Sequence, residues 1–232
     1  MTEPTPTSAT SEDTPAQAAD ESSASDAASV PDAGHGDDQE ILTVAYERLR
    51  HSTDPAELSD FARRELPDRA DQAAFSRATA LLEAVAGNPH TPVEDRVHLA
   101  ESMPFPNVLV KLAIDPEPAV RKAVAGNTDD KNWLVGRLTK DEVPEVRDAA
   151  LVNPKTSWKM RLEGAQNPQV DASTLDFLAK LGRDSEEGAP KVLSSMVRRA
   201  VALNPNATDA ILDYLADDPS PEVVHAVQRR RA

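Results

Sequence analysis

Apolar residues return with helical spacing after several asparagines of the chain. At offsets of 8, 11 and 12 residues from Asn204 lie Leu212, Leu215 and Ala216, and the same offsets from Asn167 again give leucine, leucine and alanine. Residues three and four apart share one face of an α-helix. The pattern therefore predicts short amphipathic helices, each of which follows an asparagine turn.

The segment that precedes each asparagine is itself repeated. Residues 115–127, DPEPAVRKAVAGN, recur as residues 141–153, DEVPEVRDAALVN, with a shift of 26 residues. A third copy, VRRAVALNP, covers residues 197–205, and partial copies occupy 85–89 and 218–223. Similarity at a fixed period is the signature of a repeat architecture. Because units this short cannot bury their own apolar face, they are expected to stack into a solenoid.

The residues that punctuate the repeat predict its turns. Several copies open on aspartate followed by proline, which is typical of a helix start with aspartate as N-cap and proline in the first turn. The asparagine tolerates left-handed backbone, and the proline after it in several copies prevents the helix from continuing. Each unit is thus predicted to be a helix, an asparagine-centred turn and a second helix.

The pattern Asp-Pro-x-x-x-Val-Arg-x-x-Val-Ala-x-Asn-Pro resembles the variant leucine-rich repeat, an all-helical repeat of bacterial proteins. Its aspartate and Val-Arg pair are also similar to HEAT-type repeats. The resemblance covers residues 84–227, and a looser copy from Asp54 extends it into a helical cap over 41–83. It implies an all-α, right-handed solenoid over 41–232 that binds another protein. The polar stretch 183–190 interrupts the pattern, so we expect an irregular joint or a mobile loop there.

The negative charge of the chain is concentrated at one end. Ten of its forty acidic residues and none of its twenty-five basic ones lie in residues 1–40, so the rest carries only −5 of the total −15. This segment has hardly a large apolar residue and is predicted to be a disordered tail. It is either a solubilising leader or an interaction segment, with phosphorylation at Thr5 or Thr14 or a regulatory contact with the arginines of the repeat.

Three arginines occupy equivalent positions in the repeat: Arg121, Arg147 and Arg198. They predict either a basic stripe for an acidic partner or a ladder of Arg–Asp pairs with Asp115 and Asp141. The repeated asparagines are interpreted as turn caps rather than as ligand-binding amides. Trp133 and Trp158 follow an asparagine by six and five residues, and either anchor a partner or fill the joint between repeats.

No motif in the chain indicates catalysis. It has no cysteine, no histidine pair with metal-ligand spacing and no glycine-rich nucleotide loop, so neither a metal nor another cofactor is expected. It also lacks a recognisable signal peptide and any long apolar run, which favours a cytoplasmic protein without membrane contact. The leading hypothesis is a non-catalytic protein-interaction scaffold. The alternative is a nucleic-acid-binding HEAT-like protein such as a DNA glycosylase, for which the tryptophans and arginines are the support and the acidic balance is unfavourable.

Overall fold

The computed structural model describes residues 40–129 and 133–232. The predictions for the acidic tail fall, up to residue 39, outside the described residues. Within the described part of the chain there are thirteen α-helices, and the all-α class is confirmed for that part.

The helices are short, and most have between seven and eleven residues. They are α2 (Leu42–His51), α3 (Pro55–Arg63), α4 (Gln72–Ala86), α5 (Val93–Ser102), α6 (Pro106–Leu112), α7 (Pro118–Gly126), α8 (Val135–Leu138), α9 (Pro144–Val152), α10 (Trp158–Gln166), α11 (Ala172–Lys180), α12 (Lys191–Leu203), α13 (Asp209–Ala216) and α14 (Pro221–Arg231). The predicted cap over 41–83 thus contains α2, α3 and the first part of α4.

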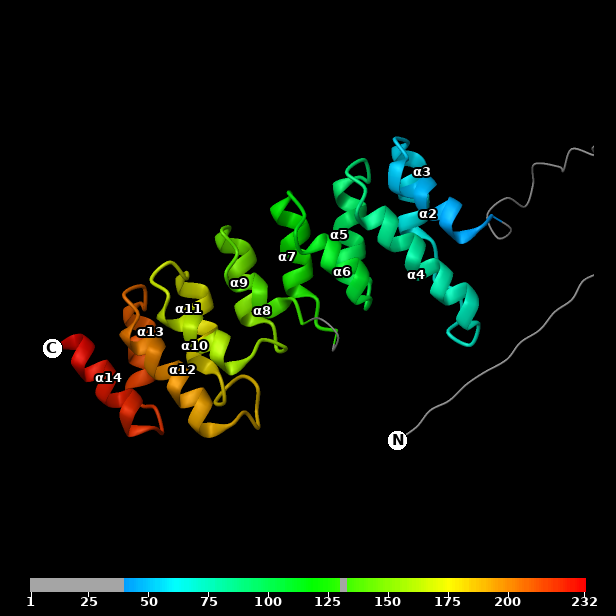
Figure 1. Cartoon of the computed structure of the whole chain (residues 1–232). Helices are drawn as coiled ribbons and strands as arrows, with labels where there is room; N and C mark the ends of the chain where they lie inside the picture. Colours follow the sequence, from blue (N-terminus) through cyan, green and yellow to red (C-terminus); the bar gives the residue numbers. More distant parts are fainter. Residues whose placement is uncertain (1–39, 130–132) are drawn as a thin grey trace, which may run out of the picture. The chain divides into compact units, whose positions relative to one another are not determined.

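Nearly all helices pack against the next helix and the next but one. The odd-numbered helices from α3 to α13 form one row, and α2, α4, α6, α10, α12 and α14 belong to the other, with the single-turn α8 seated between α7 and α9. Figure 1 shows the helices of residues 40–232 following one another from α2 to α14. This two-row stacking is solenoid-like, as the repeat predicts.

The core lies between the two rows. The apolar faces predicted from the spacing are buried: Leu175, Leu178 and Ala179 are fully buried in α11, and Leu212 and Leu215 are buried in α13. The buried apolar residues form two clusters, the first ending at Ala150 and the second beginning at Leu151. A thin core of leucine, valine and alanine, continued from repeat to repeat, is what a chain with 3% aromatic residues can build.

The aspartate that opens the clear repeats is not the N-cap, so that prediction is wrong for Asp115, Asp141 and Asp218. It is confirmed at Asp54 of the looser copy, which is the N-cap of α3. Helix α7 begins at Pro118 with Glu117 as its cap, and Asp115 lies two residues further upstream. The side chain of Asp115 accepts a hydrogen bond from the Glu117 N–H (2.9 Å), which closes an Asx turn before the helix. The same turn precedes α9 and α14. The aspartate lies outside the helix because its other carboxylate oxygen binds an arginine of the neighbouring repeat.

The asparagines do not adopt left-handed backbone, which corrects a second prediction. Asn127, Asn153 and Asn204 all have negative φ, near −70°, and extended ψ. Among the described residues other than glycine, only Glu186 has a positive φ. The asparagine is needed for its side chain, which reaches the neighbouring helix of the same row.

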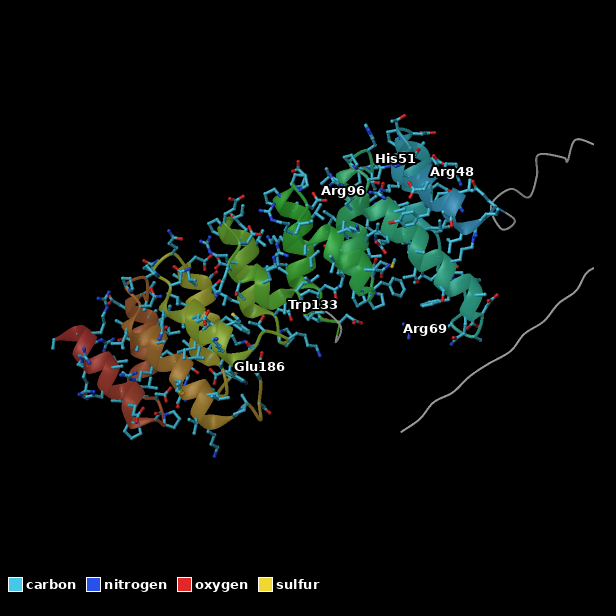
Figure 2. All side chains as sticks on the ribbon, in the orientation of Figure 1. Arg48, His51, Arg69, Arg96, Trp133 and Glu186 are labelled. Carbon is cyan, nitrogen blue, oxygen red and sulfur yellow. The ribbon has the colours of Figure 1, made fainter. Side chains whose placement is uncertain are left out.

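Residues 181–190 form the irregular joint that the sequence predicts. The chain turns back on itself through a bond from the Gly182 N–H to the Ser185 carbonyl (2.8 Å), and Glu186 has φ +49°. The Glu186 carboxylate binds both terminal nitrogens of the fully buried Arg161, at 2.5 and 2.7 Å. Figure 2 shows Glu186 on this connection between α11 and α12. The insertion therefore supplies the carboxylate that Arg161 requires.

No helix within residues 40–129 and 133–232 is long and apolar enough to cross a membrane.

Helices α9 and α10 approach closely at Gly164. A Cβ atom at this position would overlap the δ-methyl groups of Leu151. We predict that Gly164→Ala destabilises the fold by about 1–3 kcal/mol, because overpacking outweighs the gain of about 1 kcal/mol in helix propensity. A Cβ atom at Gly126 would meet nothing within 4 Å, so Gly126→Ala should leave stability unchanged or raise it by about 0.5–1 kcal/mol. Urea unfolding of the two variants measures the contrast, and equal midpoints would contradict the close approach.

Candidate partner-binding groove

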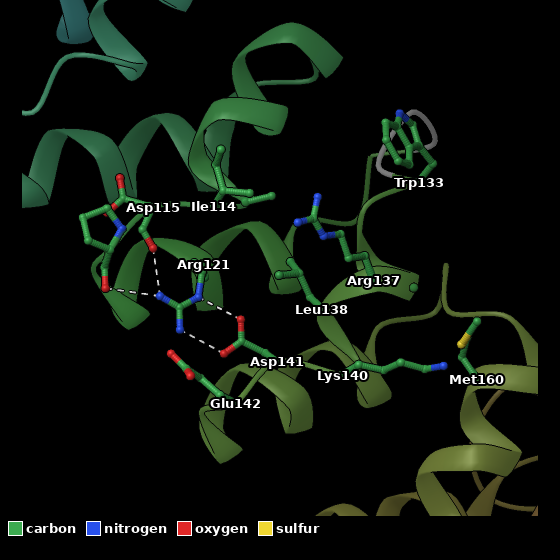
Figure 3. Close-up of a pocket in the computed structure, with 13 residues that line it drawn as sticks. Ile114, Asp115, Arg121, Trp133, Arg137, Leu138, Lys140, Asp141, Glu142 and Met160 are labelled. Atoms are coloured by element: carbon green, nitrogen blue, oxygen red, sulfur yellow. Dashed lines mark hydrogen bonds and ion pairs between the residues drawn. The ribbon is translucent and has the colours of Figure 1, made fainter.

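A ladder of buried arginines connects successive repeats. The Nε and Nη2 atoms of Arg121 donate to the two carboxylate oxygens of Asp141, at 2.8 and 2.9 Å, and Nη1 donates to the backbone carbonyls of Asp115 and Pro116 (Figure 3). Arg198 binds Asp218 through the same two atoms, at 2.7 and 3.1 Å. Arg–Asp pairing, one of the two interpretations of these arginines, is thus observed for Arg121 and Arg198 but not for Arg147.

Burial determines what these arginines can do. Arg121, Arg147 and Arg198 are 8%, 7% and 3% exposed, whereas a basic stripe requires exposed guanidinium groups. A buried charge is tolerated when it is paired and fully hydrogen-bonded. Although burial raises the pKa of Asp141, its hydrogen bonds from Arg121 and from the Val143 N–H lower it by more, and the bond with Asp141 raises the pKa of Arg121. The two groups therefore stay charged inside the repeat joint.

The asparagines form a second ladder parallel to the first. The Asn153 amide donates to the carbonyls of Ala125 and Asn127, at 2.7 and 2.9 Å, and its oxygen accepts from the Lys155 N–H. The same bonds join the ends of α4 to α2, α7 to α5 and α12 to α10. The predicted capping role is confirmed and extended, because each amide caps its own turn and also the preceding helix of its row.

A cleft with a volume of about 970 Å³ lies beside Trp133. It is formed by the α6–α7 connection, α8 and the start of α10. Its rim carries two exposed apolar side chains, Trp133 (67% exposed) and Ile114 (61% exposed), and Met160 lines its far side. Figure 3 shows Trp133 on the segment that leads into α8, away from the Arg121–Asp141 pair at the other end of the cleft. We call this cleft the Trp133 groove.

The two tryptophans have different environments. Trp158, the first residue of α10, is half-buried against the second core cluster, and the Arg161 guanidinium lies 5.0 Å from its ring centre. Trp133 projects into solvent (Figure 2). The interpretation that a tryptophan fills a repeat joint therefore applies to Trp158, and the geometry suited to a partner anchor belongs to Trp133.

Charged side chains of both signs border the Trp133 groove. Arg137, Lys140 and Glu142 are exposed, and Asp141 is bound to Arg121. Ile114 and the two exposed cations were not among the site residues predicted from the sequence. An apolar residue immediately before the Asx-turn aspartate, where the chain leaves a helix, was the available signal for Ile114. Within the described ranges no cluster of three or more metal-ligating side chains occurs.

Comparison of the chain with protein-family models, with characterised proteins and with solved structures gave no match. The resemblance to variant leucine-rich and HEAT-type repeats accordingly stays a prediction from the sequence pattern.

A pair of carboxylates, Asp148 and Asp171, lies next to the arginine ladder, between α9 and α11. Burial raises the pKa of Asp148 to about 6, and the nearby carboxylate of Asp171 adds to this effect. Asp171 is the N-cap of α11, and the bond it accepts from the Thr174 N–H (2.7 Å) is the main cause that lowers its pKa. Asp148 is thus the member of the pair that holds a proton in mildly acidic solution.

This pair predicts a pH dependence of stability. The folded chain binds a proton at Asp148 up to about pH 6 and the unfolded chain only to about pH 4, so this group lowers the free energy of unfolding as pH rises through that window. Asp148→Asn should therefore stabilise the fold by about 1–2 kcal/mol at pH 7.5 and have little effect near pH 4, measured by urea unfolding. The exposed Glu187→Gln is the control. A gain from Asp148→Asn that is equal at both pH values would refute the assignment.

Proposed function

We propose that this protein is a non-catalytic interaction scaffold that binds another protein through the Trp133 groove. The observation that carries the proposal is the exposed indole of Trp133 beside exposed Ile114 at the rim of a 970 Å³ cleft. The resemblance to bacterial helical repeats and the expected cytoplasmic location are retained as parts of the same proposal.

The energetics of a tryptophan support this choice. A tryptophan side chain covers roughly 200 Å², and burial of apolar surface contributes about 25 cal/mol per Å². Residues that dominate binding are enriched in tryptophan and cost at least about 2 kcal/mol when truncated. A protein with few aromatic residues gains little from exposing one of its two tryptophans unless a partner covers it.

The charge around the Trp133 groove favours a protein partner over nucleic acid. A phosphate backbone requires a continuous positive surface, because most of the affinity comes from neutralised phosphates. Here Lys140 is paired with Glu163, the acidic Glu142 is exposed on the same groove, and the three ladder arginines are buried. An amphipathic protein surface with charges of both signs matches such a rim better.

Trp133→Ala tests this proposal. The full chain, immobilised and exposed to native lysate, is expected to retain a stoichiometric partner, and Trp133→Ala should weaken that binding by about 30-fold or more, the consequence of losing about 2 kcal/mol. Because Trp133 is largely exposed, its loss should leave thermal stability unchanged.

Val192→Ala is the matched control, since Val192 is 71% exposed but lies outside the Trp133 groove. It should bind as the unaltered chain does. Recovery of no stoichiometric partner, or equal loss in both variants, would rule out the Trp133 groove as the binding site.

A further inference from the structure

Arg147 lacks the carboxylate that its equivalents have. Its Nη1 donates to the backbone carbonyls of Asp141 and Glu142, both at 2.9 Å, just as Arg121 Nη1 binds the carbonyls six and five residues before it. The guanidinium group is therefore held in the same orientation. In Arg121 the Nε and Nη2 atoms hold an aspartate, but Arg147 Nε is buried without a hydrogen-bond partner in the described chain, and Nη2 forms no bond there.

A change of repeat register explains the missing group. The paired aspartate lies 20 residues after its arginine in the Arg121 and Arg198 repeats. Twenty residues after Arg147 stands Asn167. The turn asparagine lies six residues after its arginine, and Asn167 is also the sixth residue after Arg161. Asn167 thus occupies the aspartate position of one repeat and the asparagine position of the next, and it cannot serve as both.

Arg147 lines a cleft of the described chain. This cleft has a volume of about 540 Å³ and is lined by Arg147, Asn167, Lys140, Glu163 and Gln169, among others. It shares Lys140, Asp141, Glu142 and Met160 with the Trp133 groove. We call it the Arg147 cleft.

The acidic side chains near Arg147 either bind other residues or form no side-chain bond with its guanidinium group. Asp141 is bound to Arg121, and Glu163 pairs with Lys140 at 3.1 Å. Burial raises the pKa of Asp148, the next residue, and the Arg147 charge lowers it, but the side-chain hydrogen bonds of Asp148 are with Asp171 and Thr174. Glu142 is exposed, and Arg147 is bonded only to its backbone carbonyl. No side chain of the described residues supplies the carboxylate that the Nε–Nη2 edge accommodates in the other repeats.

We propose that the Arg147 cleft binds a carboxylate group from a ligand, held by Nε and Nη2 of Arg147 as Asp141 is held by Arg121. The geometry favours a carboxylate because a guanidinium edge presents two parallel N–H groups at the spacing of two carboxylate oxygens. Because the cleft adjoins the Trp133 groove, this inference rests on the proposed function and deepens it: an acidic side chain of the partner occupies the cleft while Trp133 is covered.

The test uses the purified full chain and needs no partner, so its outcome is independent of the pull-down. The Arg147 Nε–Hε resonance is followed by NMR while sodium acetate replaces sodium chloride at constant ionic strength. A second titration uses the blocked peptide acetyl-Gly-Glu-Gly-amide, and its glutamine analogue serves as control. The expected result is a saturable displacement of this resonance by acetate and by the glutamate peptide, but not by chloride or by the glutamine peptide.

The two titrations distinguish the sources of the carboxylate. Half-saturation by the peptide at lower concentration than acetate indicates a side chain on a polypeptide, and the reverse order indicates a small free carboxylate. Either order supports a carboxylate site. Absence of any saturable displacement would overturn the proposal.

Asn167→Asp restores the missing group within the chain. An aspartate is not foreign to this turn, because the aspartates at the other joints accept the same N–H bond that Asn167 accepts from Gln169. The variant should abolish the response to acetate, whereas Gln166→Glu, which adds the same charge one residue away on an exposed position, should preserve it. An unchanged response in Asn167→Asp would contradict the proposal.

Arg147→Lys provides an independent check, because lysine keeps the charge but lacks the two parallel donors. Acetate should raise the midpoint of thermal unfolding of the unaltered chain above its value in chloride, and this rise should vanish in Arg147→Lys. A rise of the same size in the lysine variant would count against bidentate binding.

Discussion

The bidentate bond between a buried arginine and an aspartate of the following joint is the interaction on which this structure depends. Arg121 reaches Asp141, and Arg198 reaches Asp218, each across 20 residues of sequence. The aspartate also closes the turn before the next helix, so one carboxylate sets both the turn and the spacing between repeats. Removing one partner of a buried ion pair costs about 3–5 kcal/mol, because the other charge is left buried and unpaired.

Two buried arginines of the repeat, Arg161 and Arg147, depart from this pairing with an aspartate. Arg161 obtains its carboxylate from Glu186, on an inserted segment that adopts unfavourable backbone to provide it. Arg147 obtains none, because the register changes at Asn167. Both exceptions occur around α10, where the arginine-bearing helices pass from the odd row to the other row. The Trp133 groove is lined by Met160 of α10, so the exposed Trp133 side chain lies beside the part of the stack where the repeat is irregular.

Much of the fold was predictable from the chain because its signals are local and repeated. Spacing after Asn167 and Asn204 located α11 and α13, and the 26-residue shift located α7 and α9. The N-cap role given to Asp115 and the left-handed turn given to Asn127 were wrong. Both predictions assigned a local task to a side chain that bonds a residue 19 or more positions away. Local propensity carries no information about such a partner.

The sequence by itself determined that short helices recur, that one helix of each clear repeat ends at an asparagine, and that arginines and aspartates recur at fixed positions within the repeat. These properties follow from periodicity, which a single chain displays. Only the tertiary structure decided that Trp133 is exposed while Trp158 packs against the core, that Ile114 and Lys140 meet at one groove, and that Arg147 faces a cleft without a carboxylate. The physical reason is that the exposure and the pairing of a side chain depend on which helices become neighbours in the stack. The place of α10, where the repeat changes register, is likewise set by packing across the whole repeat.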